Sequence, residues 1–341
     1  MGSQTTPPKY GFETEGLELV NRFPDQVKGR IFLITGPSAG GIGGETATSL
    51  AAGRPAMLIL LGRSQSRVQP IIDAITSTSP STAVKFVQVD LSVLSSVRAA
   101  AATILSDTDI PHIDVLINNA AIMASPLART PEGFESQFAS GYLGHFVLTN
   151  LLLPKILAAG TGTAAPGGGR RIVNVSSVGN RMHPVRWADP NWTEPGAYDP
   201  WDAYGQTKTA NILFTIALNR RLADAGYAPE KVKAYSLHPG SIPSNLQVHL
   251  NRAPELREDA VRKTFRGGPN PIKSWKTLQQ GCATTLRAAL DPGLPGEEGM
   301  WLVDAELSTD PTWIESWSLD EGDAERLWEL SEGLVGEKFE L

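Results

Sequence analysis

The chain has 341 residues, of which 41% are hydrophobic and 19% charged, and its formal net charge is −6. This amount of apolar material suffices for a large core and excludes a wholly disordered chain. The acidic balance argues against a protein that binds nucleic acid by neutralising phosphates. Cys282 is the single cysteine, so an intramolecular disulfide is excluded and a reducing, cytoplasmic compartment is expected. No apolar run reaches the roughly 18 residues of a membrane span.

Short apolar runs alternate with segments of helical spacing. Runs without polar alternation are typical of strands buried on both faces of a parallel sheet. The sequence therefore predicts an α/β fold, a Rossmann-type doubly wound parallel sheet of about seven strands with helices on both faces. The expected strands are 31–35, 56–61, 84–89, 114–117, 171–176, 232–237 and 300–303, and the expected helices are 43–53, 67–78, 93–107, 132–159, 202–225 and 275–291.

The predicted organisation has three parts. Residues 1–28, which are polar and contain no signal-peptide core, are expected to form an N-terminal extension. Residues 29–305 are expected to form the catalytic domain, and residues 306–341 a tail that packs a final amphipathic helix on it. Two stretches, 179–202 and 241–275, are too long for plain connectors and are predicted to be substrate loops.

A glycine-rich turn follows the first predicted strand and opens a helix, as a dinucleotide-binding site requires. Glycines let the backbone approach a pyrophosphate, and the next helix aims free N–H groups at it. The second strand ends at Arg63, where a guanidinium suits a 2′-phosphate, so the predicted cofactor is NADP(H). A solvent-facing arginine is the alternative reading. The residues predicted for this turn are Gly36, Ser38, Gly41, Ile42 and Gly43.

Tyr204 and Lys208 are four residues apart, which places both on one face of a helix. An ammonium there lowers the pKa of a phenol and helps it exchange a proton near neutral pH. Ser177 follows the fifth predicted strand, at the sheet edge where open α/β proteins bind ligands. Taken singly, these residues also fit a surface tyrosine and lysine and a strand-end cap.

Together these residues carry a resemblance. The chain resembles the short-chain dehydrogenases/reductases over about residues 28–305, and most of all their retinol-dehydrogenase-like branch. The matching pieces, in order, are Thr35-Gly36 with Gly41-Ile42-Gly43, Asp90-Leu91-Ser92, Asn118-Asn119-Ala120-Ala121, Leu143-Gly144-His145-Phe146, Asn174-Val175-Ser176-Ser177, Tyr204 with Lys208-Thr209-Ala210-Asn211, and His238-Pro239-Gly240.

The resemblance implies roles for individual residues. Tyr204 would be the catalytic acid/base, Lys208 would lower its pKa and bind the nicotinamide ribose, and Ser177 would orient the substrate oxygen. Hydride would pass between the cofactor and a carbonyl carbon. The remaining cofactor contacts would be Asp90 and Leu91 at the adenine, Asn119, Ala120 and Ala121 along the middle, and Pro239, Gly240 and Ile242 at the nicotinamide.

The chain departs from the family pattern in three places. Ala121 stands where the family commonly has glycine, which is a mild change. Four residues, rather than the usual three, separate Gly36 from the Gly41-Ile42-Gly43 run, so we expect a wider phosphate loop that still binds. Gly141 stands where the family usually has an asparagine that is thought to hold a water of the proton relay. Glycine has no side chain to hold this water, which puts the proton relay in doubt. A glycine at this position could also accommodate a bend or a bulky ligand.

The leading hypothesis is an NADP(H)-dependent oxidoreductase acting on an alcohol, ketone or aldehyde. The Trp-rich stretch 179–202 favours a bulky lipophilic substrate, with His183 and Trp187 expected to contact it together with Ser177 and Tyr204. The alternatives are a non-redox catalyst of isomerisation, cyclisation or dehydration, which Gly141 motivates, and an NADP(H)-binding regulator. No metal-ligand spacing is present, so no metal is expected.

Assembly is a further expectation. A homodimer would pair the two long helices, with Ile212, Leu213, Ile216 and Leu222 serving either the core or the interface.

Overall fold

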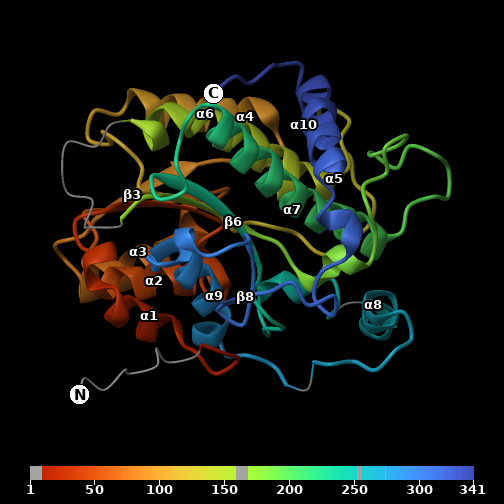
Figure 1. Cartoon of the computed structure of the whole chain (residues 1–341), viewed down its shortest axis with the longest axis horizontal. Coiled ribbons are helices and arrows are strands. Elements are labelled where there is room, and N and C mark those ends of the chain that lie inside the picture. Colours follow the sequence, from red (N-terminus) through yellow and green to blue (C-terminus); the bar gives the residue numbers. More distant parts are fainter. Residues whose placement is uncertain (1–9, 159–167, 252, 254, 273) are drawn as a thin grey trace.

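The computed structural model describes residues 10–158, 168–251, 253, 255–272 and 274–341. Its centre is an eight-stranded sheet of order β3-β2-β1-β4-β5-β6-β7-β8, parallel except for the last strand (Figure 1). The chain thus crosses over between β1 and β4, which leaves a crevice at their carboxyl ends. The strands are β1 (Ile31–Thr35), β2 (Met57–Gly62), β3 (Ala83–Gln88), β4 (Val115–Asn118), β5 (Arg170–Val175), β6 (Val232–His238), β7 (Trp301–Val303) and β8 (Glu306–Leu307).

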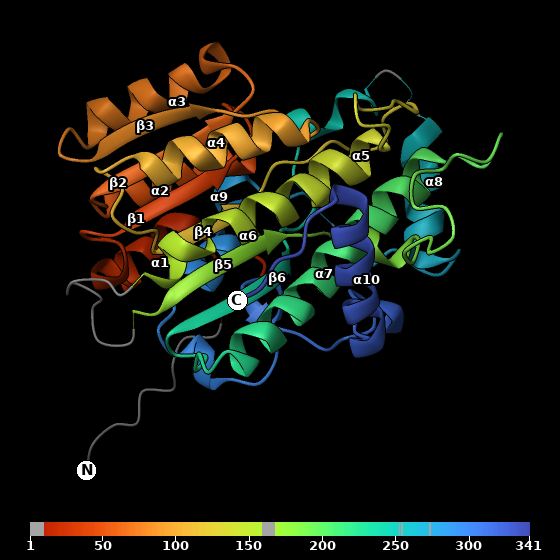
Figure 2. The ribbon, with the colours of Figure 1, turned by 90° about the horizontal axis from the view of Figure 1, so that it is seen from above.

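Helices cover both faces of the sheet (Figures 1 and 2). One face carries α1 (Gly16–Arg22), α2 (Ile42–Ala52), α3 (Gln65–Thr78) and α9 (Leu278–Leu290). The other carries α4 (Leu94–Ser106), α5 (Ser136–Phe138), α6 (Gly144–Leu157), α7 (Pro200–Asp224) and α10 (Glu321–Val335). Strand β1 explains the arrangement: Ile31 and Leu33 belong to one apolar core, Phe32 and Ile34 to the other, and all are buried. The predicted doubly wound parallel sheet is confirmed.

The seven predicted strands are present, and the structure adds β8, a two-residue antiparallel edge strand. It joins β7 through Asp304 and Ala305, which both adopt positive φ, the conformation of a tight hairpin. Two residues are too few to give a periodic signal, so β8 could not be predicted from the sequence.

The helix predicted at 132–159 begins later and is interrupted. Glu135 caps the N-terminus of α5, because its carboxylate accepts hydrogen bonds from the backbone N–H groups of Gln137 and Phe138, both at 2.8 Å. The first helix of this segment therefore begins at Ser136. A π-helical turn, Ala139–Leu143, then joins α5 to α6. Residue 159 lies outside the described residues. Similarly, α9 begins at 278 because Thr277 and Gln280 form a reciprocal capping box.

The N-terminal segment packs on the sheet's helical layer. Leu19 and Val20 of α1 are fully buried in the same core as α2 and α9. A Cβ atom on Gly16 would overlap Cys282 Sγ, so only glycine allows α1 to lie this close to α9. Residues 1–9 of the expected extension are outside the described part of the chain.

The C-terminal helix α10 lies across α7 (Figure 2). Trp328 meets the rings of Phe146 and Phe214 at 5.1 and 5.9 Å, and the Arg221 guanidinium stacks on its indole at 3.9 Å. Arg221 also forms a bidentate ion pair with Glu325. The apolar residues on which the homodimer expectation depended are used within the chain: Ile212, Leu213 and Leu222 are buried, and Ile216 is half-buried.

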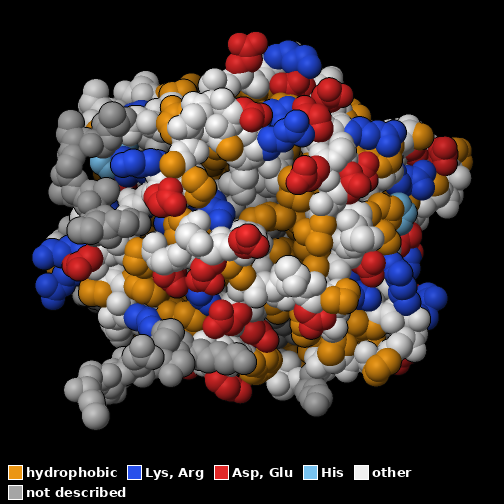
Figure 3. All heavy atoms as spheres, viewed as in Figure 1, with side chains coloured by type: hydrophobic (Ala, Val, Ile, Leu, Met, Phe, Trp, Pro, Cys, Tyr) orange, Lys and Arg blue, Asp and Glu red, His pale blue; other side chains and the backbone are white. Residues whose placement is uncertain are grey.

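Acidic and basic side chains are interspersed over the face drawn in Figure 3, rather than gathered by sign. Within the described ranges, no helix combines the length and the apolarity that a bilayer crossing requires.

Candidate active site

A cavity of about 700 Å³ opens at the carboxyl ends of the central strands, at the crossover between β1 and β4. It brings together most of the residues predicted from the sequence, although they come from every part of the sheet. The predicted residues that line it are Gly36, Ser38, Gly41, Ile42, Arg63, Asp90, Leu91, Asn119, Ala120, Ala121, Ser177, Tyr204, Lys208, Pro239, Gly240 and Ile242. Gly43, His183 and Trp187 are not in its wall.

The glycine turn forms one side of the cavity. Gly36 has a φ of +68°, and a Cβ atom there would lie 2.9 Å from the Cβ of Ala120, so the turn can approach the β4 loop only with glycine. Gly43 lies behind the wall, where a Cβ atom would overlap Asn119 Nδ2. Helix α2 begins at Ile42 and presents its free N–H groups to the cavity. This cradle suits the pyrophosphate of a dinucleotide.

Thr35 ties the glycine turn to the loop after β4. Its Oγ1 accepts hydrogen bonds from the backbone N–H groups of Asn119 and Ala120, at 2.9 and 3.0 Å. It also lies 2.8 Å from Nε2 of His145, whose Nδ1 is 3.3 Å from the carbonyl oxygen of Gly141. Burial lowers the pKa of His145 to about 4, so the ring is neutral. The carbonyl contact then requires the proton on Nδ1, and Thr35 donates to Nε2.

This network was not predicted as part of the site. The sequence contains Thr35 and His145 within matched motifs, but their contact joins residues 110 positions apart.

The far end of the cavity carries the residues expected at the adenine ribose. Arg63 follows β2 and is exposed, with Arg67 also in the wall one turn further on. Asp90 is held in place, because its Oδ1 accepts from the N–H and the hydroxyl of Ser92 at 3.0 and 2.6 Å. An exposed guanidinium and a carboxylate in one cavity wall could bind a phosphate and a base, respectively.

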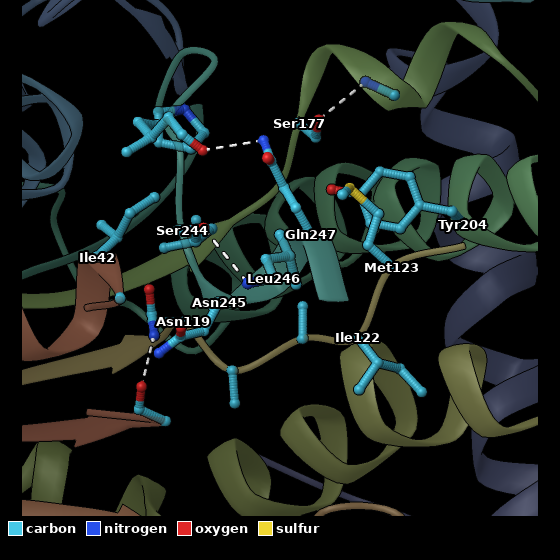
Figure 4. A pocket seen from close by; sticks show the side chains of 18 of the residues that line it. Ile42, Asn119, Ile122, Met123, Ser177, Tyr204, Ser244, Asn245, Leu246 and Gln247 are labelled. Carbon is cyan, nitrogen blue, oxygen red and sulfur yellow. Dashed lines mark hydrogen bonds between the residues drawn. The ribbon is translucent and has the colours of Figure 1, made fainter. Parts of the chain in front are cut away.

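Ser177, Tyr204 and Lys208 line the other end of the cavity, where Figure 4 shows Ser177 and Tyr204. Ser177 caps a short 3-10 turn, with Oγ accepting from Gly179 N at 3.0 Å. Asp199 caps α7 and so fixes where Tyr204 lies on its first turns. Lys208 is 2% exposed, and its Nζ donates to the carbonyl oxygen of Val175 at 2.9 Å. The three side chains therefore converge from β5 and α7.

Burial governs the protonation of both titratable groups. It raises the pKa of Tyr204 to about 12, although a hydrogen bond with Ser177 acts in the opposite direction. It lowers the pKa of Lys208 to about 7. Lys208 Nζ lies 5.5 Å from the centre of the Tyr204 ring and is bonded to Val175. The resolved shift of the Tyr204 pKa comes from burial and from Ser177, and the lowering of this pKa by Lys208 stays a prediction.

His183 and Trp187 lie away from the cavity, which does not support their expected contact with substrate. His183 Nδ1 is 2.6 Å from the carbonyl oxygen of Pro184, and its ring packs on Trp192. The guanidinium carbon of Arg326, on α10, lies 4.4 Å from the centre of the Trp187 ring. The aromatic residues of segment 179–202 thus pack on each other and on α10, and the segment reaches the wall only through Gly179, Met182 and Trp201.

The second long loop supplies the rest of the substrate end. We call residues 243–275 the lid; it contains a 3-10 turn, η4 (Asn245–Val248), and helix α8 (Glu255–Phe265). About half of its side chains in the wall are apolar. Together with Met123, which the sequence did not indicate, they include Leu246, Val248, Leu250, Val261, Phe265 and Trp275.

Gly141 sits in the π turn, against α7. A Cβ atom there would lie 2.6 Å from Cγ2 of Thr207. The glycine therefore has a packing role: it lets the π turn approach α7 at Thr207, next to Lys208 and one turn from Tyr204. The structure has a π-helical turn at this position, and the expected bend stays a prediction. Among the described residues, no three His, Cys, Asp or Glu side chains are grouped so that they could hold a metal ion.

Comparison with known proteins gives consistent results. A family described as short chain dehydrogenase matches residues 30–190. The chain is 36% identical over 314 residues to the short-chain dehydrogenase/reductase prx1 of Penicillium roqueforti, covering 90% of this chain and 85% of that one. It is 34% identical over 313 residues to retinol dehydrogenase 11 of Homo sapiens, covering 91% and 87%.

A crystal structure of an uncharacterised protein from Mycobacterium paratuberculosis is 32% identical and superimposes with a TM-score of 0.64, covering 92% of this chain and 96% of the other.

Proposed function

Because the chain belongs to the short-chain dehydrogenase/reductase family, whose members use a nicotinamide cofactor, we propose that it is an NADP(H)-dependent carbonyl reductase for bulky lipophilic substrates. The observation that supports this proposal most directly is the convergence of Ser177, Tyr204 and Lys208 in one cavity with a glycine cradle. The same arrangement serves the reverse reaction, oxidation of the corresponding alcohol, and the cofactor pool decides the direction.

The cofactor, when bound, supplies or accepts the hydride at the substrate carbon. Tyr204 then donates its hydroxyl proton to the carbonyl oxygen during reduction, while the Ser177 hydroxyl donates a hydrogen bond to the same oxygen. Lys208 lies one turn along the same helix face, where its ammonium stabilises the tyrosinate that remains. Both Tyr204 and Lys208 are nearly inaccessible to water, so the proton passes directly between the phenol and the substrate.

The preference for NADP(H) rests on Arg63 and Arg67. Both line the adenine end of the cavity, and no carboxylate follows β2 where one would bind a ribose 2′-hydroxyl. Arg63 is exposed and unconstrained by an ion pair in the described part of the chain, so it can form a bidentate contact with a 2′-phosphate.

The substrate proposal rests on the walls around Tyr204. Met123, Met182, Trp201, Leu250 and Phe265 give this end a broad apolar lining. Such a lining contacts a large hydrocarbon body, while Ser177 and Tyr204 orient the single reacting oxygen. A small polar sugar or hydroxy acid would leave most of this surface without a partner.

No specific observation favours a non-redox catalyst, because the packing of Gly141 against Thr207 explains the glycine that motivated it. A regulator without turnover has no evident need for all three catalytic side chains. The cytoplasmic location, the small-molecule partner and the absence of a nucleic-acid partner are parts of the same proposal. A homodimer also remains a proposal, and it would need a surface other than the α7 residues named above.

The test is consumption of NADPH by the purified chain with a panel of ketones and aldehydes of increasing apolar bulk. We expect turnover with NADPH, faster than with NADH, and a kcat/KM that rises with the apolar area of the substrate. If NADPH binds but no carbonyl compound or alcohol in the panel is turned over, the proposal of a reductase is wrong.

A further inference from the structure

The glycine turn touches the lid at its tip. Asn245 Nδ2 donates to the carbonyl oxygen of Ala39 at 2.7 Å, and the backbone N–H of Asn245 lies 3.4 Å from the carbonyl oxygen of Gly40. Gly40 has a φ of +72°, and a Cβ atom there would be only 3.2 Å from Asn245 Nδ2. The turn and the lid thus come together closely at a glycine, and two donors of one residue meet two adjacent carbonyl groups.

The contact depends on the extra residue of the turn. Four residues separate Gly36 from Gly41, and Ala39 and Gly40 are the last two of them. They are the part of the turn that projects from the cavity wall: Gly36, Pro37, Ser38 and Gly41 line the cavity, while Ala39 and Gly40 do not. The additional length therefore extends the rim of the cavity rather than its floor.

The lid closes the other side of this rim. Its two ends are held together, because the backbone N–H of Lys276 donates to the carbonyl oxygen of Ser241 at 2.8 Å. Beyond that neck, Ser244, Asn245 and Leu246 line the cavity, and Figure 4 shows Ser244 and Asn245 beside Ile42 and Asn119, with Tyr204 farther away. The contact of Asn245 with Ala39 and Gly40 thus spans the cavity between its adenine and nicotinamide ends.

We propose that Asn245 and the enlarged tip of the glycine turn form a gate over the cofactor channel, which must open for the dinucleotide to enter and to leave. The inference rests on the proposed cofactor site. It adds that the gate is closed in the free protein as well as in the complex, because its contacts are made entirely between groups of the chain. A closed gate slows both association and dissociation, and it changes the affinity much less than either rate.

The test compares Asn245→Leu, which keeps the size of the side chain but removes its donor, with Asn251→Leu as a matched control. Asn251 lies on the same lid and is exposed, and its side-chain amide accepts a hydrogen bond from Arg257 of the lid itself. Stopped-flow fluorescence of NADPH gives both rate constants. We expect Asn245→Leu to raise association and dissociation rates together by roughly two- to tenfold, the range of one neutral hydrogen bond, with Kd changed less than twofold. Asn251→Leu should change neither rate.

A second readout needs no cofactor. Hydrogen exchange of the free protein should show faster exchange at residues 244–248 in Asn245→Leu than in the parent or in Asn251→Leu, because the lid opens more often once the side-chain hydrogen bond to Ala39 is lost. If Asn245→Leu fails to fold, Asn245→Ser replaces it, since serine is too short to reach Ala39.

The outcomes are distinct. Unchanged rates and unchanged exchange would overturn the gate. A raised dissociation rate and Kd with an unchanged association rate would also overturn it, because Asn245 would then be a direct ligand. If the parent does not bind NADPH at all, the proposed function fails, whereas the exchange experiment still decides whether Asn245 holds the lid to the turn.

Discussion

The Cβ position of Gly141 lies 2.6 Å from the Cγ2 methyl of Thr207, so the π turn and α7 meet where only a hydrogen fits. We expect Gly141→Ala to destabilise the protein by about 1–3 kcal/mol, the range for overpacking, which exceeds the roughly 0.5–1 kcal/mol that alanine gains over glycine in a helix. Thr207→Ser removes the methyl and keeps the hydroxyl that donates to Ala203 O at 2.8 Å. Urea unfolding of both single variants and the double variant should give a large coupling energy, whereas additive effects would contradict this packing role.

The same contact decides how the missing asparagine can be studied. Gly141→Asn adds the same Cβ atom as Gly141→Ala. Its effect on turnover should therefore be measured in the Thr207→Ser variant, where removal of the methyl group leaves room for the added carbon.

Tyr204 is predicted to be the proton donor. Tyr204→Phe should lower kcat by roughly 10²–10⁴-fold, the range of general acid catalysis, and leave the Kd of NADPH nearly unchanged. Tyr227→Phe is the matched control, since Tyr227 is half-buried outside the cavity and should not affect turnover. Equal turnover of the Tyr204→Phe variant and the parent would exclude this role.

Arg63 is predicted to select the cofactor. Arg63→Ala should weaken NADPH binding by about 1.5–3 kcal/mol, the value of a hydrogen bond between charged groups, and should affect NADH little. Calorimetric titration with each cofactor measures both effects, and NADH serves as the internal control. A similar loss for the two cofactors would show that Arg63 does not contact the 2′-phosphate.

Lys208 is predicted to make stability depend on pH. Burial lowers its pKa from 10.5 to about 7, so between these values the unfolded chain holds a proton that the folded chain has released. The free energy of unfolding therefore rises with pH in this window, by at most about 1.4 kcal/mol per pH unit, and the contribution is constant below pH 7.

Lys208→Met removes this contribution while keeping a similar length. The difference in unfolding free energy between parent and variant, measured in urea without cofactor, should shift in favour of the parent from pH 7 to pH 9.5. A difference that does not change with pH would contradict the lowered pKa.

Trp328 is predicted to anchor α10. Trp328→Ala should cost about 3–5 kcal/mol, because the indole packs on Phe146, Phe214 and the guanidinium of Arg221. Leu319→Ala, at a side chain that is 41% exposed just before α10, should stay within roughly 0.5 kcal/mol of the parent. Thermal unfolding of the three proteins checks the ranking, and equal losses would show that α10 adds little to the core.

The sequence predicted the sheet well because its strands are continuous apolar runs, as at 31–35, and burial on both faces leaves no other use for them. The sequence did not predict the role of side chains whose role depends on which residues they contact in the fold. The tryptophans at 187 and 192 suit a substrate wall and a folded loop equally, and the structure packs them on Arg326 and Arg186.

The proposed catalytic side chains, Ser177, Tyr204 and Lys208, were selected from a spacing on one helix and from a strand end, and both signals can be read in the sequence alone. The shifted pKa values of Tyr204 and Lys208 could not be predicted from the sequence. They depend on how deeply each group is buried and on the hydrogen bond from Lys208 Nζ to the carbonyl oxygen of Val175. The role of Gly141 was also hidden, because its reason is a methyl group 66 positions along the chain.

The hydrogen bond from Lys276 N to Ser241 O has a consequence for how such an enzyme can change its substrate. With entry and exit of the lid side by side, the intervening 34 residues can be lengthened, shortened or exchanged as one cassette without displacing β6 or α9. The entropic cost of loop closure grows only slowly with length, by about 0.6 kcal/mol for each doubling. New apolar linings can therefore evolve, or be grafted between related enzymes, while β5 and α7, which position Ser177, Tyr204 and Lys208, stay as they are.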